Sequence, residues 1–173
     1  QVTLTQAIVW MMVQIALAGL ILLSYNFNSI ILGLSSLFLI VIYPFAKRFT
    51  WWPQLFLGLA FNWGILLLFA AHTGSLNWPI IALYFAGIFW TLFYDTIYAY
   101  QDSQDDLIIG VKSTAILFGE HAKKWLFSFI LFCFVLMAVS VFIITQERTI
   151  LSKFVSYIGV LSFSLHLFSQ WRS

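Results

Sequence analysis

Residues 125–145 read WLFSFILFCFVLMAVSVFIIT and contain no charged side chain. A helix needs roughly 20 apolar residues to cross the hydrocarbon core of a bilayer, and this stretch has that length. The whole chain is 62% hydrophobic and only 8% charged, whereas an ordinary soluble domain is roughly 25% charged. The composition therefore predicts an integral membrane protein and excludes both a soluble globule and a disordered chain.

Six apolar stretches of this kind follow one another along the sequence. Inside lipid the backbone finds no water to bond, so helices are the default, and the alternation typical of a β-barrel is absent. We therefore predict an all-α, polytopic transmembrane helical bundle that forms one integral-membrane domain over residues 1–173, with the bilayer as its partner. The predicted spans are 7–24, 29–45, 55–71, 79–98, 125–145 and 154–168.

The basic residues are distributed unequally between the two sides of the predicted bundle. Strict alternation of the spans leaves Arg148 and Lys153 alone on one side. The positive-inside rule then places the richer side in the cytoplasm or in the mitochondrial matrix. A net charge of +2 is too small to indicate a nucleic-acid partner. The richer side carries Lys47, Arg48, Lys112, Lys123, Lys124 and Arg172.

Four of the six acidic residues, Asp95, Asp102, Asp105 and Asp106, lie together at the start of the charged connection 95–124. If the fourth helix continues through them, steps of about 100° place all four within an arc of roughly 100°. Like charges at this spacing repel, and no cation is interleaved to offset them. Mg²⁺ is bound by one or two carboxylates together with water and phosphate oxygens. The cluster therefore predicts a divalent-cation site, while a solvated acidic loop is the alternative.

Cations lie close to these acids in the sequence or on the same side of the membrane. Lys112 follows Asp106 closely, and Lys47 and Arg48 end the second span. Mg²⁺ on a diphosphate, with Lys and Arg on the outer oxygens, is a common way to bind and release that leaving group. For Lys47 and Arg48 the alternative is that they only set the topology of the chain. Cys133 is the single cysteine, so no disulfide framework is expected.

Two segments resemble a known family. The stretch YDTIYAYQDSQDDLIIGVKSTAILFG at 94–119 closely resembles the second aspartate-rich motif of the UbiA superfamily of membrane prenyltransferases. Its form DTxYAxxDxxDDxxIGxKST is similar to the 4-hydroxybenzoate polyprenyltransferases of ubiquinone biosynthesis. The segment YPFAKR at 43–48 resembles the YPFxKR stretch of the same group.

The resemblance implies a bundle of nine membrane helices, of which about six are present here, around a cavity open at its cytoplasmic or matrix mouth. It implies Mg²⁺-dependent transfer of a polyprenyl group from polyprenyl diphosphate to the ring carbon ortho to the hydroxyl of 4-hydroxybenzoate, in a bacterial or mitochondrial inner membrane. By analogy, Asp102, Asp105 and Asp106 hold Mg²⁺ and, with Lys112, are catalytic. The residues expected to bind substrate are Tyr43, Lys47, Arg48, Asp95 and Tyr98.

The chain departs from the family pattern in one respect. The first aspartate motif of the family, NDxxDxxxD, is missing, so we expect the chain to be a fragment that alone is weak or inactive. Another UbiA-type reaction, on a different quinone precursor or on haem, is one alternative. A divalent-cation transporter subunit is another, and it predicts acidic residues near the middle of the spans. A purely structural membrane subunit is a third, which leaves the one-sided carboxylates without a role.

Overall fold

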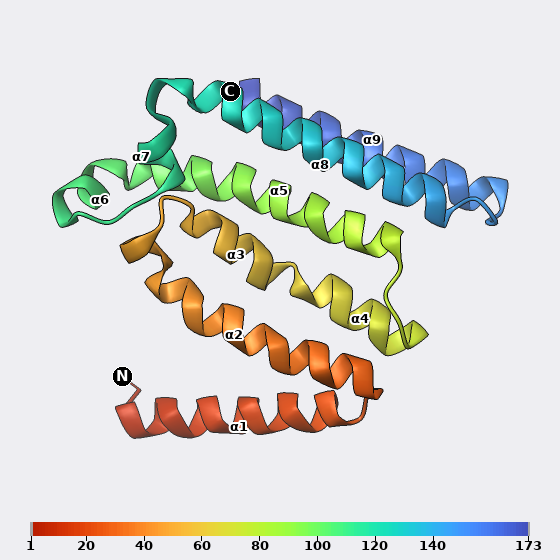
Figure 1. Cartoon of the computed structure of the whole chain (residues 1–173), viewed down its shortest axis with the longest axis horizontal. Helices are drawn as coiled ribbons and strands as arrows, with labels where there is room; N and C mark the ends of the chain where they lie inside the picture. The colour runs from red at the N-terminus through yellow and green to blue at the C-terminus, as the bar shows by residue number, and fades with distance from the viewer. Residues whose placement is uncertain (1, 173) are drawn as a thin grey trace.

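The structure is a computed structural model that describes residues 2–172, and within that range every regular element is a helix (Figure 1). Six helical segments are long and apolar enough to cross a membrane. The predicted all-α bundle with six spans is therefore confirmed, and the chain is a multi-pass membrane protein. The elements are α1 (Leu4–Leu23), α2 (Phe27–Phe49), α3 (Pro53–Phe61), α4 (Trp63–Thr73), α5 (Trp78–Gln101), α6 (Ser103–Ile109), α7 (Thr114–Phe118), the short 3₁₀ helix η1 (Gly119–His121), α8 (Ala122–Ile144) and α9 (Ile150–Arg172).

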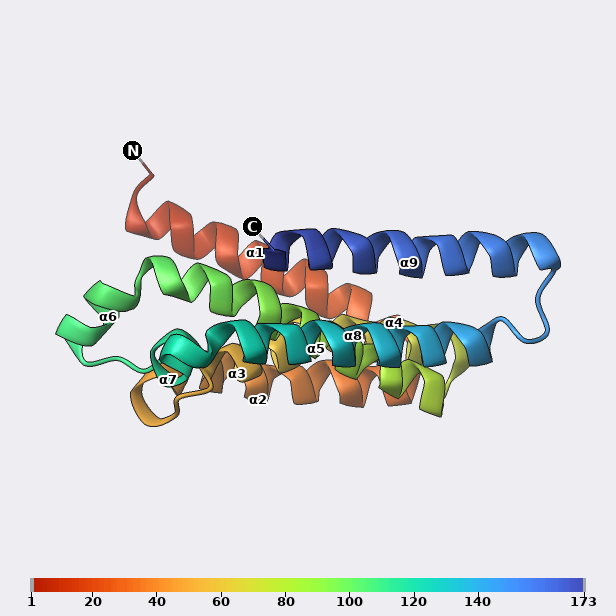
Figure 2. The ribbon, with the colours of Figure 1, turned by 90° about the horizontal axis from the view of Figure 1, so that it is seen from above.

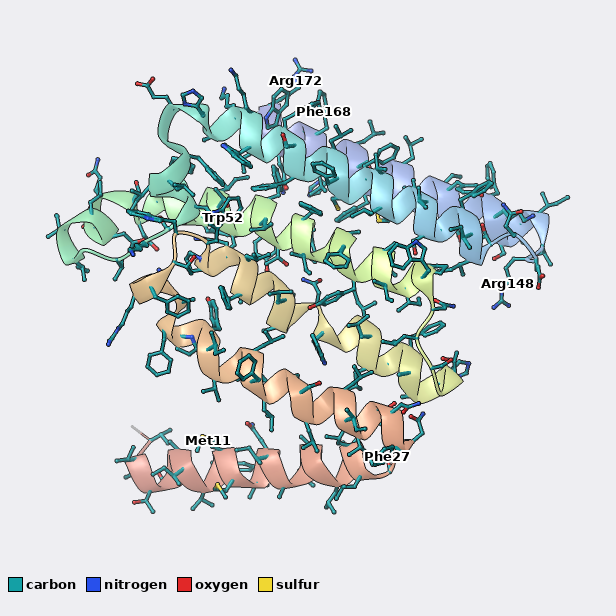
Figure 3. All side chains as sticks on the ribbon, in the orientation of Figure 1. Met11, Phe27, Trp52, Arg148, Phe168 and Arg172 are labelled. Carbon is teal, nitrogen blue, oxygen red and sulfur yellow. The ribbon has the colours of Figure 1, made fainter. Side chains whose placement is uncertain are left out.

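The spans run back and forth along one direction, so that connections alternate between two ends (Figure 1). The end of α2, the helices α6 and α7 and the start of α8 gather at one end, which we call the basic end. The connections α1–α2, α4–α5 and α8–α9 lie at the opposite end. In the view turned by 90°, α9 lies beside α8 on the side from which α1 begins (Figure 2). Arg172 and Arg148 lie toward opposite ends (Figure 3).

The fifth helix forms the centre of the bundle. Half of the apolar window of α5 is buried, whereas α1 has no buried residue. Tyr84, Ile88 and Phe93 of α5 join Phe129 and Ile130 of α8 in the main core cluster. Because α5 packs against several helices, the residues at its C-terminal end, which include Asp95 and Tyr98, have fixed positions relative to those helices.

The third span is interrupted, although the sequence predicted one continuous stretch over 55–71. The break falls at Asn62, between α3 and α4. The Asn62 side-chain nitrogen donates to the Gly58 carbonyl and to Thr91 Oγ1, both at 2.9 Å. A polar side chain that bonds a backbone carbonyl of its own helix is a known cause of local breaks.

The last span is longer than its apolar pattern suggested. We predicted 154–168, but α9 runs over Ile150–Arg172 and has 23 residues. The helix continues through the polar residues that flank the apolar segment, because its backbone hydrogen bonds do not depend on side-chain hydropathy. Its C-terminal turn thereby reaches the basic end.

Candidate functional site

The end of α2 carries the first basic segment of the site. Lys47 and Arg48 lie in its last turn, where cations interact favourably with the negative end of the helix dipole. The Lys47 side chain extends toward α6, and its Nζ lies 3.9 Å from Asp106 Oδ2. Arg48 is exposed, and Tyr43, further back on the helix, is partly buried.

The aspartate segment does not form one helix, so the condition under which all four carboxylates would share one helix face is not met. The helix α5 ends at Gln101, Asp102 lies at the junction with φ −95° and ψ 0°, and α6 begins at Ser103. The Ser103 hydroxyl donates to the Tyr100 carbonyl at 2.8 Å, which satisfies an acceptor at the end of α5. The four carboxylates are consequently divided between two helices and their junction.

Asp106 differs from the other acids of the segment. It is 8% exposed, whereas Asp102 and Asp105 are exposed and Asp95 is partly buried. Its Oδ2 atom is buried and has no hydrogen-bond partner among the described residues, and Lys47 Nζ at 3.9 Å is too distant to form a hydrogen bond. A buried carboxylate oxygen without a partner is unfavourable, so this atom is suited to accept a cation or a donor group.

The acids do not assemble a metal site by themselves. In the part of the chain that the structure describes, no three His, Cys, Asp or Glu side chains converge closely enough to hold an ion. Calcium takes about six to eight oxygen ligands, most of them from the protein, whereas Mg²⁺ takes one or two carboxylates and fills its shell with water and phosphate oxygens. The one buried oxygen of Asp106 beside exposed carboxylates fits the second pattern.

Lys112 is brought next to Lys47 by the loop that follows α6. Its backbone amide donates to the Lys47 carbonyl at 2.9 Å, and its Nζ donates to the Phe49 carbonyl at 3.5 Å. The same ammonium group lies 5.5 Å from the ring centre of Trp51. The structure thus brings Lys47, Lys112 and Asp106 together at the basic end.

A buried polar link supports this loop, and sequence reasoning missed it. Gln54 Oε1, at the start of α3, accepts a hydrogen bond from the Thr114 amide at 3.2 Å. The hydroxyl groups of Thr114 and Thr96 lie 2.7 Å apart, and all three residues are at most 2% exposed. The only sequence signal for this link is the pair of polar segments KST at 112–114 and PQ at 53–54. Polar residues at the edges of apolar spans are candidates for buried hydrogen bonds.

Aromatic residues of α5 line a cavity beside the aspartate segment. Its volume is about 470 Å³, and it lies between the α3 and α5 side and α9. Tyr98, a predicted substrate-binding residue, is on its wall, whereas Tyr43 is not among the lining residues. His166 also lines it, although the sequence gave this residue no ligand spacing. The other lining residues are Phe61, Trp90, Tyr94, Phe163, Leu167 and Gln170.

An aromatic cluster closes the basic end from the other side. Trp52 packs edge-on against Phe118 and Trp125, with ring centres 5.3 and 5.7 Å apart, and Phe118 stacks on Trp125 at 4.7 Å. Figure 3 shows Trp52 at the start of α3, facing α7 and α8. These contacts join α3, α7 and α8, so the short helix that follows Lys112 is fixed to the membrane helices.

Comparison with known proteins finds relatives that share one name. Relatives named mitochondrial 4-hydroxybenzoate polyprenyltransferase include one from Drosophila melanogaster, 53% identical over 130 residues, which are 75% of this chain and 33% of the relative. The relative from Homo sapiens is 52% identical over 125 residues, or 72% of this chain and 34% of the relative. The one from Dictyostelium discoideum is 45% identical over 175 residues, with 100% of this chain and 36% of the relative covered.

The chain spans about a third of the length of the curated relatives it matches. No solved structure matches it significantly. The model of the UbiA prenyltransferase family matches residues 1–173, and the chain therefore belongs to the UbiA prenyltransferase family.

Proposed function

We propose that this chain forms the diphosphate-binding part of a 4-hydroxybenzoate polyprenyltransferase. The observation that carries the proposal is the buried, unpartnered Asp106 Oδ2 beside Lys47 and Lys112 at the basic end. The Lys47 ammonium lies beside the anionic atom, and the Lys112 backbone is bonded to that of Lys47. Carboxylate and ammonium groups at one end of the bundle suit a ligand that carries both signs, and a metal-bound diphosphate is such a ligand. The choice of a polyprenyl group as donor and of 4-hydroxybenzoate as acceptor follows the names of the relatives.

The residues present fit Mg²⁺ as a group that arrives with the substrate. Asp106 would hold it, and the exposed carboxylates of Asp102 and Asp105 are near enough in the chain to share it or its water ligands. When bound, Mg²⁺ would stabilise the negative charge that develops on departing diphosphate. Asp95 is within electrostatic range of Lys47, so it helps to orient that ammonium group.

The cations of the basic end would act on the outer oxygens of the diphosphate. Lys47 and Lys112 are held in place, the first by Asp106 and the second by its bonds to the end of α2. Arg48 is exposed in the same helical turn and is free to close over the ligand. As the allylic C–O bond breaks, the electron pair stays with the diphosphate, and these charges stabilise it.

The aromatic cavity would receive the reacting end of the prenyl chain. Trp90, Tyr94 and Tyr98 line this cavity on the side of α5 that faces α9, and an aromatic ring stabilises a nearby cationic carbon by roughly 0.5–2 kcal/mol. The ring carbon ortho to the hydroxyl of the acceptor then forms the new C–C bond and loses its proton. The remaining isoprene units are apolar and gain by lying among the helices.

The distribution of acids argues against a divalent-cation transporter. Such a protein needs acidic groups along the middle of its spans. Asp95 lies in the last two turns of α5, and the other described acids lie beyond the end of α5 or outside the apolar parts of the spans. The relatives named mitochondrial suggest an inner membrane as the location, with the basic end facing the matrix or the cytoplasm.

Two measurements test the proposal. The first is calorimetric titration of the purified chain with geranyl diphosphate, for which we expect uptake only when Mg²⁺ is present. The second is formation of prenylated 4-hydroxybenzoate, detected by mass, in membranes of a host that lacks this activity. In the full-length protein, Asp102→Asn should reduce transfer sharply, while Glu147→Gln, which removes one acid at the opposite end, should not. Metal-independent binding, or wild-type turnover in Asp102→Asn, would contradict the assignment.

A further inference from the structure

The start of α8 carries two lysines that the proposed reaction does not use. Lys123 and Lys124 lie in the first turn of this helix, which contains no acidic residue. Cations are unfavourable there because the helix N-terminus already carries a partial positive charge. In residues 2–172 the only ion pair joins Lys47 to Asp106, so neither lysine is neutralised by a carboxylate. An external anion would be stabilised at this position.

These lysines line a cavity at the basic end of the groove between α8 and α9. Its volume is about 370 Å³, and its other lining residues are Phe127, Ser128 and Trp171. The Trp171 indole N–H donates to the Lys123 carbonyl at 3.0 Å, which holds the end of α9 against the start of α8. The rings of Trp171 and Phe127 are 5.3 Å apart. The cavity therefore combines two ammonium groups with an aromatic wall.

An apolar groove continues from this cavity along the same pair of helices. It has a volume of about 210 Å³ and shares Phe127 with the cavity. Its apolar lining includes residues at helical spacing on each side, namely Phe127, Leu131 and Phe134 of α8 and Leu161, Leu165 and Phe168 of α9. Lys124 to Phe134 spans about 15 Å along a helix, which is roughly half of a hydrocarbon core of about 30 Å.

We propose that the groove between α8 and α9 binds an anionic phospholipid. The phosphate would lie on Lys123 and Lys124, and one acyl chain would follow the apolar groove into the same leaflet. The two lysines match the charge of a phosphate headgroup, and the apolar groove that continues from the cavity favours a phospholipid over a free phosphate, because only the lipid has a chain to occupy it. Basic pockets between transmembrane helices on the cytoplasmic or matrix side are suited to such headgroups. The site is distinct from the Lys47 and Asp106 site, which lies on α2 and α6.

The test compares lipid selectivity in bilayers. The chain is reconstituted in phosphatidylcholine vesicles, and the protein-bound fraction of spin-labelled phosphatidylglycerol is compared with that of spin-labelled phosphatidylcholine. The variant is Lys123→Gln with Lys124→Gln, and the matched control is Arg148→Gln with Lys153→Gln, which removes two positive charges at the opposite end. The ratio of the two bound fractions should fall by roughly fivefold for each lysine removed from the site, and it should hold in the control.

Further arms keep the result independent of folding. Lys123→Arg with Lys124→Arg should retain the selectivity, and raising salt should lower it in the unmodified chain because the contact is electrostatic. Equal losses in the variant and the matched control, or no loss in the variant, would overturn the proposal. Displacement of the labelled lipid by inorganic phosphate or by geranyl diphosphate with Mg²⁺ would also overturn it, since either result would assign the lysines to a different ligand.

Discussion

The Lys112 amide donates a 2.9 Å hydrogen bond to the Lys47 carbonyl, and this bond joins the two sequence segments that carry the family resemblance. Lys47 is in the last turn of α2, and Lys112 follows the turn that ends α6. The bond holds together the backbones of two lysines that are remote in the chain. The arrangement of the basic end therefore depends on the conformation of the loop that precedes Lys112.

Gly110 sets that conformation, and its replacement should separate stability from ligand binding. Its φ of +78° is a left-handed value that costs a residue with a side chain roughly 1–2 kcal/mol. Gly110→Ala should lower the unfolding midpoint in detergent and weaken Mg²⁺-dependent binding of geranyl diphosphate. Gly74→Ala is the control, because Gly74 has φ +81° at the opposite end. Gly74→Ala should lose similar stability and keep its affinity for geranyl diphosphate with Mg²⁺. Equal affinity losses in both variants would contradict the role of the loop.

Removal of the Asp106 charge should weaken metal-dependent binding more than it changes stability. Asp106→Asn keeps the shape of the side chain and removes the negative charge of the carboxylate whose buried oxygen lies beside Lys47. We expect an affinity for geranyl diphosphate with Mg²⁺ that is lower by roughly tenfold or more, measured by calorimetry. Glu147→Gln should bind as the unmodified chain does. If Asp106→Asn also bound normally, Asp106 would not be a ligand.

The hydrogen bond between Thr96 and Thr114 should appear as a coupling energy. Each single change to Val leaves the other buried hydroxyl without its 2.7 Å partner, whereas the double variant removes both hydroxyls. The double variant should therefore lose less stability than the sum of the single variants, by roughly 0.5–1.5 kcal/mol. Unfolding in mixed micelles measures the cycle, and strict additivity would show that the two hydroxyls do not interact.

The contact between Gly87 and Asn62 should not accept a larger residue. A Cβ atom at Gly87 would collide with the Asn62 side-chain amide, which its two bonds to Gly58 and Thr91 hold in place. Gly87→Ala should destabilise the bundle by about 1–3 kcal/mol. Gly64→Ala, where nothing lies within 4 Å, should be neutral or slightly stabilising in the thermal unfolding midpoint. Similar losses in the two variants would indicate a general cost of alanine in these helices instead.

Several features could be predicted from the sequence because they depend on local composition. The run 125–145 has no charge to oppose insertion, and bilayer thickness fixes the length of a span, so the number and type of the spans followed. Strict alternation of the spans predicted which loops share an end of the bundle, and the unequal distribution of the lysines and arginines predicted the side that this end faces. The break at Asn62 was not predicted, since the bond from its side chain to Thr91 forms only when α5 is in place beside it. The break at Asp102 was not predicted either.

The amino-acid order alone determined a helical membrane chain of the UbiA type, with acids and cations on the same side. The bilayer selects spans by the hydropathy of each segment and orients them by the charge of their flanks. Both properties belong to the sequence and do not depend on how the helices pack. Only the tertiary structure decided that Asp106, among four acids, is the buried one, and that Lys47 and Lys112 meet beside it. Burial and proximity arise because α2 packs on α3, α3 packs on α5, and α6 and α7 pack on α5. No local pattern specifies such long-range contacts.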